Sequence, residues 1–214
     1  LGVNLVGNTL NSVMSNPFPQ LSPRLSVSFA LTDDIDLNAN FGRYAMQPSY
    51  TSMGYQAPDG TYPNKMRLRY IMSNQAVLGG EYHLGSYLHF SAEGFYKSYS
   101  SYPISELEGI SLASKGTEYG QVGAEAVLST GEGRAYGAEV VARLMPWHQF
   151  SATATYTLFR SEFTDKAGIY RPSSWDTRQM LNLLLSYRLG KSWHLSTSWR
   201  YSGGAPYTPI DMEL

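Results

Sequence analysis

The stretch "WHLSTSWRYS" at residues 193–202 alternates apolar and polar side chains with a period of two. One face is largely apolar and carries Trp193, Leu195, Thr197, Trp199 and Tyr201. The other face is polar and carries His194, Ser196, Ser198, Arg200 and Ser202. Because a β-strand turns successive side chains to opposite faces, this stretch predicts a strand with one apolar and one polar face.

Seven more segments repeat the same alternation. We expect strands near residues 21–31, 35–44, 67–84, 87–97, 135–144, 150–160, 178–189 and 193–202. The apolar faces of these segments carry no charged residue over the alternating positions. Their charges fall on the interleaved positions, at Arg24, Asp36, Glu81, Glu93, Lys97, Glu139, Arg143, Arg188 and Arg200. The pattern predicts an all-β fold in which every strand has one apolar face.

The connections between the predicted strands alternate in length. Short turns are expected at 32–34, 85–86, 146–148 and 190–192, and long connections at 45–64, 98–133 and 161–176. Short turns on one side and long loops on the other are typical of an outer-membrane barrel. The apolar bands are about as long as a tilted strand needs to cross a bilayer, and aromatic residues lie near their ends. A soluble sandwich also buries one face of each strand, so this alternative stays open.

Composition excludes several other classes of protein. The 214 residues include 16 Lys plus Arg and 17 Asp plus Glu, which gives a net charge of −1 and no footprint for nucleic acid. Charged residues make up 15% of the chain, against about 25% in an ordinary soluble domain. The absence of cysteine excludes a disulfide framework, a thiolate metal site and a cysteine nucleophile. No apolar run is long enough for a transmembrane helix.

Several stretches resemble the barrel of TonB-dependent outer-membrane receptors of the Bacteroidetes type. They are "LSPRLSVSFAL" at 21–31, "NANFGRYAMQPSY" at 38–50, "SAEGFYKSY" at 91–99, "GEGRAYGAEV" at 131–140, "YTLFRSEF" at 156–163, "PSSWDTRQMLNL" at 172–183 and "RYSGGAPYTP" at 200–209. The resemblance implies an antiparallel transmembrane barrel segment of about eight strands, spanning 1–214, within a 22-stranded barrel. We expect the chain to be a fragment from the C-terminal part of that barrel, without the plug domain.

The same resemblance implies a function and partners. Such receptors lie in the bacterial outer membrane, in contact with its lipid, and import a metal chelate, cobalamin or a glycan. They take their energy from TonB, through parts of the protein that this chain lacks. Two alternatives remain open: a self-contained eight-stranded outer-membrane barrel with a structural or adhesive role, and a soluble β-sandwich binding module. In a slice of a larger barrel, the strands at 21–31 and 193–202 should not pair with each other.

No motif in the sequence indicates catalysis, a metal site or a cofactor. His83, His89, His148 and His194 lack the spacing of a zinc site, and "GEGRAYG" at 131–137 lacks the Lys-Ser/Thr of a phosphate-binding loop. We therefore expect no enzymatic activity and no bound cofactor.

The long loops offer the expected ligand-binding surface. Tyrosine and tryptophan supply contact area at low entropic cost and stack on sugars or flat chelates, and arginine attracts anions. The candidates are Tyr50, Tyr55, Tyr62, Tyr102, Tyr119, Tyr170, Trp175, Arg67 and Arg171. The alternative for the aromatic residues is that they form the aromatic girdle at the membrane–water interface or pack among the loops. The alternative for the arginines is pairing with acids such as Glu162 and Asp165.

Overall fold

The computed structural model describes residue 14, residues 20–115 and residues 122–206. Nine strands form one antiparallel sheet in the order β1-β2-β3-β4-β5-β6-β8-β9, with β7 paired to β6. The bounds are β1 Arg24–Ala30, β2 Ile35–Met46, β3 Ile71–Leu84, β4 Leu88–Ser105, β5 Val127–Trp147, β6 Phe150–Thr164, β7 Tyr170–Pro172, β8 Gln179–Leu189 and β9 Trp193–Ser202. A short helix α1 (Tyr50–Met53) and a 3-10 helix η2 (Leu112–Ser114) lie in the loops.

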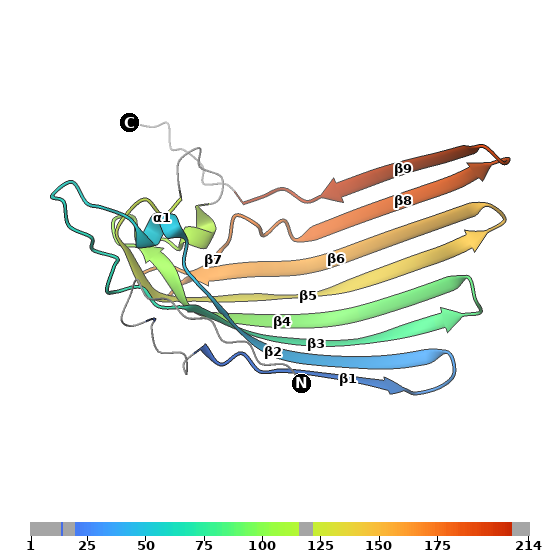
Figure 1. The fold of residues 1–214 in the computed structure, drawn as a ribbon, viewed down its shortest axis with the longest axis horizontal. Helices are drawn as coiled ribbons and strands as arrows, with labels where there is room; N and C mark the ends of the chain where they lie inside the picture. The colour runs from blue at the N-terminus through green and yellow to red at the C-terminus, as the bar shows by residue number, and fades with distance from the viewer. Residues whose placement is uncertain (1–13, 15–19, 116–121, 207–214) are drawn as a thin grey trace.

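The sheet is a single open layer. Figure 1 shows the short turns together at one end and the long loops at the other. Among the described residues, the edge strands β1 and β9 do not pair with each other. The predicted antiparallel order and the separation of the two edges are therefore confirmed. An open sheet of this kind is part of a barrel, and it is neither a closed eight-stranded barrel nor a two-layered sandwich.

The strand register confirms which residues share a face. Leu78 pairs with Gly94, Gly94 with Ala138, and Ala138 with Leu158, so one apolar face continues from strand to strand. The large apolar side chains of this outward face are exposed, as at Leu78, which is 68% exposed. The interleaved polar residues line the opposite, inward face. Such an uncovered apolar face suits contact with lipid, because lipid needs no second protein layer to bury it.

Several strand bounds differ from those expected. β4 continues to Ser105 and β5 already begins at Val127. Both strands therefore extend into the region 98–133, which was expected to be one long connection. Ser101 has a φ of 58° and lies in a bulge between Tyr99 and Tyr102, and this extra residue breaks the period of two that marked the strand. The sequence pattern therefore ended the strand too early.

Other differences are smaller. β1 is shorter than 21–31, and β3 begins at Ile71 because a turn precedes it, with the N–H of Arg67 and of Leu68 donating to the Asn64 carbonyl. β5 continues through Pro146, so the turn before β6 falls at His148 and Gln149, both with positive φ. Paired positive φ values match the twist of a two-residue hairpin.

The buried apolar residues gather at the long-loop end, in the loops and in the strand ends beside them, rather than in the middle of the sheet. They include Leu68, Tyr70, Ile71, Ile104, Ala113, Val127 and Phe163. This placement means that the loops fold against the ends of the long strands and form a packed structure of their own.

Candidate functional site

The buried side chain of Asn64 holds three backbone segments of the loop end together. Its Nδ2 donates to the carbonyls of Ser52 (2.7 Å) and Glu125 (2.8 Å), and its Oδ1 accepts from the N–H of Val127 (2.9 Å). Asn64 is 1% exposed, so water cannot replace these hydrogen bonds. The loop after β2 is thereby attached to the start of β5, about 60 residues further along the chain.

Lys115 forms a second attachment point. Its Nζ lies 2.8 Å from Glu108 Oε1 and 2.7 Å from Glu125 Oε1, and its side chain is 4% exposed. Burial would lower the pKa of this ammonium, but the hydrogen bonds and charges of the two carboxylates outweigh it and hold the pKa above its ordinary value. The Ser105 hydroxyl also donates to Glu125, which joins the end of β4 to the same cluster.

The loop before β8 joins this assembly through Asp176. Its buried carboxylate accepts from the Ser161 N–H (3.0 Å) and pairs with Arg160 Nη1 (3.3 Å). Ser174 donates from its hydroxyl to the Ala113 carbonyl (2.8 Å), which ties this loop to η2. All three long connections are therefore linked to one another at the end of the sheet.

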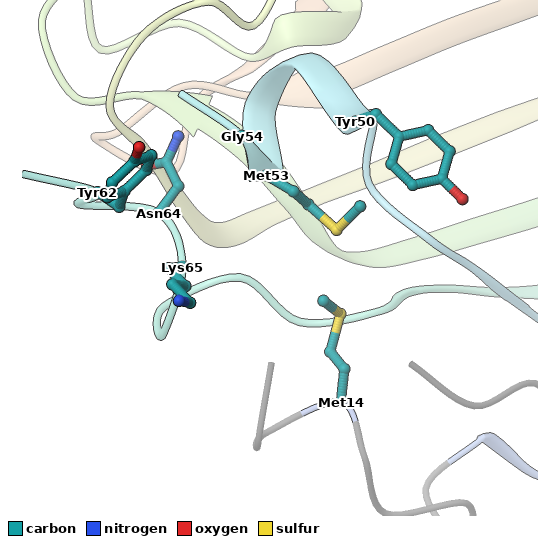
Figure 2. A pocket seen from close by; sticks show the side chains of 7 residues that line it. All are labelled: Met14, Tyr50, Met53, Gly54, Tyr62, Asn64 and Lys65. Atoms are coloured by element: carbon teal, nitrogen blue, oxygen red, sulfur yellow. The ribbon is translucent and has the colours of Figure 1, made fainter. Parts of the chain in front are cut away.

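A pocket of about 250 Å³ lies within this loop assembly (Figure 2). It is lined by Met14, Tyr50, Met53, Gly54, Tyr62, Asn64 and Lys65. The helix α1 carries Tyr50 and Met53 into it, and the Ser49 hydroxyl caps this helix by accepting from the Ser52 N–H. The pocket presents two phenol rings, two thioethers and one ammonium group. These groups suit a flat, largely apolar ligand with negative charge.

The structure brings two of the candidate residues together in this pocket. Tyr50 is 75% exposed and Tyr62 is 51% exposed, so both rings are accessible. Tyr55 lies in the same loop, half-buried, and does not line the pocket. Arg67 pairs with Glu106 at 3.5 Å on the loop surface.

Tyr102 lies in β4 rather than in a loop, because the strand is longer than expected. Its ring packs 4.5 Å from Phe163 and 6.5 Å from Tyr99, centroid to centroid. It also lines a separate cavity of about 400 Å³, together with Ile71 and Leu112. This arrangement matches the alternative of packing among the loops.

The remaining candidates lie apart from the pocket. Tyr170 lies in β7, where the Arg134 guanidinium sits 4.2 Å from its ring centre. Trp175 is 68% exposed in the loop before β8. Arg171 forms an ion pair with Asp165 at 2.8 Å, which matches the alternative that the arginines pair with acids of the loops. Tyr119 is outside the described residues.

Sequence reasoning missed the pocket residues Met14, Met53, Asn64 and Lys65. Met53 follows Tyr50 by three residues, a spacing that places both on one side of a helical turn, but α1 is too short to give a periodic signal. Asn64 has no local signal, because its partners are distant in the sequence.

The fold and loop arrangement can be compared with known proteins. Residues 3–211 match the sequence model of the family described as TonB dependent receptor-like, beta-barrel. The chain belongs to this family. Its members are outer-membrane receptors, which accounts for the uncovered apolar face. No curated protein sequence matches this chain.

Solved structures of TonB-dependent receptors share the fold. The ferric-catecholate import receptor Fiu from E. coli K12 superposes with a TM-score of 0.61 at 14% identity, over 86% of this chain and 24% of that one. The pyoverdine receptor FpvA from Pseudomonas aeruginosa PAO1 gives 0.59 at 16%, over 86% and 25%. The FrpB iron transporter from Neisseria meningitidis gives 0.56 at 13%, over 84% and 26%. This TonB-dependent receptor chain thus spans about a quarter of their length.

Within the described residues, no three His, Asp or Glu side chains are grouped so that they could hold a metal ion. None of the helices in the described part of the chain has the length and apolar character needed to cross a membrane.

Proposed function

We propose that this chain forms part of the barrel of a nutrient-uptake receptor in the bacterial outer membrane, with its long loops outside the cell. Family membership and the uncovered apolar face support this location. The plug and the TonB-contacting segment would belong to other parts of the receptor. The order and spacing of the seven stretches between residues 21 and 209 support a receptor of the Bacteroidetes type.

We propose that the ligand binds in the pocket lined by Tyr50 and Tyr62. Among the expected ligand classes, this pocket favours an anionic metal chelate with flat aromatic rings. A volume of about 250 Å³ is small for cobalamin, and a glycan would require more hydrogen-bonding groups than these rings and thioethers supply. Lys65 supplies the positive charge that an anionic chelate requires.

Binding of a panel of probes to the intact receptor tests this proposal. Ferric tris-catecholate, cyanocobalamin and a maltooligosaccharide would each be titrated by calorimetry. We expect the ferric catecholate to bind, and Tyr62→Ala to weaken it about 2- to 10-fold, the range of one aromatic contact.

Matched control variants lie at the opposite end of the sheet. Tyr87→Ala and Lys191→Gln change the short turns and should leave ferric-catecholate affinity unchanged, whereas Lys65→Gln should reduce it. Preferential binding of cyanocobalamin or the oligosaccharide would contradict the chelate proposal. Equal effects of Tyr62→Ala and Tyr87→Ala would contradict the assignment of the pocket.

A further inference from the structure

A groove of about 790 Å³ crosses the outward, apolar face of the sheet over β3 to β6. Its floor is the cross-strand pair of Gly94 and Ala138, two of the smallest side chains on this face. A Cβ added at Gly94 would meet only the Gly137 carbonyl oxygen, at 3.9 Å. The groove therefore exists because side chains are missing there, and not because the backbone is distorted.

The walls of the groove are apolar and aromatic. Tyr96 and Tyr136 stack across β4 and β5 with centroids 6.4 Å apart. Leu78 and Leu158 flank the floor and are 68% and 48% exposed. Since this face is the one expected to contact lipid, a hydrocarbon chain matches both the shape and the chemistry of the groove.

The charged residues that line the groove are both cationic. Of the described residues, Arg160 and Arg178 line it and no carboxylate does. Arg160 pairs through Nη1 with the buried Asp176 and is 40% exposed. No ion pair to Arg178 occurs in the described part of the chain. Arginine binds phosphate through several parallel N–H donors, so this end of the groove is complementary to a phosphate group.

Nearby polar contacts indicate where the headgroup region begins. Gln179 lies on the outward face, where its Oε1 accepts from the Tyr156 hydroxyl (3.0 Å) and its Nε2 donates to the Tyr201 hydroxyl (3.5 Å). Tyrosines prefer the boundary between hydrocarbon and headgroups. Gln179 pairs with Leu158 on the neighbouring strand. The arginine end of the groove is thus at headgroup level, and its floor reaches into the apolar band.

We propose that the groove binds a phosphorylated glycolipid of the outer leaflet. An acyl chain would lie over Gly94 and Ala138, and a phosphate group would contact Arg160 and Arg178. The choice of the outer leaflet rests on the proposed function, which places the long loops outside the cell, because the arginine end of the groove lies toward these loops. A sugar headgroup is favoured because the surface beyond the groove presents the Tyr170 ring and Glu132, whose Oε2 lies 3.5 Å from the Tyr170 hydroxyl.

Native mass spectrometry of the intact, delipidated receptor tests this inference. The probes are diphosphorylated lipid A, its dephosphorylated form and phosphatidylglycerol. We expect lipid A to bind most tightly, and Arg178→Gln to weaken it about tenfold, as the loss of a charge-assisted hydrogen bond predicts. Dephosphorylated lipid A should bind more weakly and should not respond to Arg178→Gln.

Two further variants separate the groove from general effects of charge or folding. Arg200→Gln removes an arginine from the inward face and should leave lipid A affinity unchanged. Gly94→Leu fills the groove where the backbone leaves room, and should weaken lipid A with no loss of receptor stability. Equal binding of phosphatidylglycerol, or equal effects of Arg178→Gln and Arg200→Gln, would overturn the proposal. Co-purification of a protein that blocks lipid A at this face would also overturn it.

Discussion

Replacing Leu183 with arginine tests the assignment of the lipid-facing side of the sheet. Leu183 lies outward in β8, paired with Ala154 and Trp199. It is near the middle of the strand between Gln179 and Leu189, which are ten residues apart. At about 3.3 Å per residue and a tilt of about 40°, this stretch covers about 25 Å across the membrane, the height of the apolar band.

The expected cost follows from this depth. An arginine near the bilayer midplane destabilises an outer-membrane barrel by about 2–4 kcal/mol, which corresponds to about 30- to 1000-fold in the folding equilibrium. Leu184→Arg is the matched control, since Leu184 faces inward between the uncharged Thr153 and Ser198. We expect it to cost less than about 1 kcal/mol, because its charge would be hydrated in the lumen. Asn182 is a poorer control because it faces Arg200.

The assay is equilibrium unfolding of the intact receptor in lipid vesicles. Trp193→Arg tests whether the cost of an arginine falls with distance from the bilayer midplane, because Trp193 lies at the start of β9 beside a short turn. We expect this variant to cost about 0–1 kcal/mol. Trp199, on the same strand, lies at the depth of Leu183, because the register places the two residues directly opposite each other. Equal costs for Leu183→Arg and Leu184→Arg would refute the outward assignment of this face.

Three other perturbations have defined outcomes. Asn64→Ala should raise hydrogen exchange at the Val127 amide and destabilise the loop assembly by about 1–3 kcal/mol, since it leaves buried backbone groups unpaired. Gly137→Ala should destabilise the barrel by about 1–3 kcal/mol in the same vesicle assay, because its Cβ would lie 2.1 Å from the Leu158 carbonyl oxygen, whereas Gly94→Ala should be tolerated. The Ile169 N–H and the Arg171 guanidinium lower the pKa of Asp165, so the stability that this carboxylate provides is present above its ordinary pKa and is lost as the pH falls through the lowered value. Exchange at the Ile169 amide should therefore rise in acid, beyond the intrinsic rate, and Asp165→Asn should remove this pH response.

The sequence by itself determined the strand phase, the antiparallel order and the separation of short turns from long loops. The strand phase is a local feature, because a period of two assigns each side chain to a face without reference to any other strand. The antiparallel order follows from the alternation of short turns and long connections along the chain. In β8, for example, the alternation alone puts Leu181, Leu183 and Leu185 on one face. The register pairs them with Tyr156, Ala154 and Ala152 of β6, on the outward face. The pattern failed where a local irregularity interrupts it, as at the Ser101 bulge that hid the end of β4.

Only the tertiary structure decided how the loops are organised. Asn64 bonds to Glu125 and Val127, and Ser174 to Ala113, contacts that join residues about 60 positions apart and leave no periodic trace. The same long-range packing placed Tyr50 and Tyr62 in one pocket while other candidates became packing or ion-pair residues. Strand alternation depends on the backbone geometry of successive residues, so the sequence reveals it. A pocket depends on which distant segments meet, so only the tertiary structure reveals it.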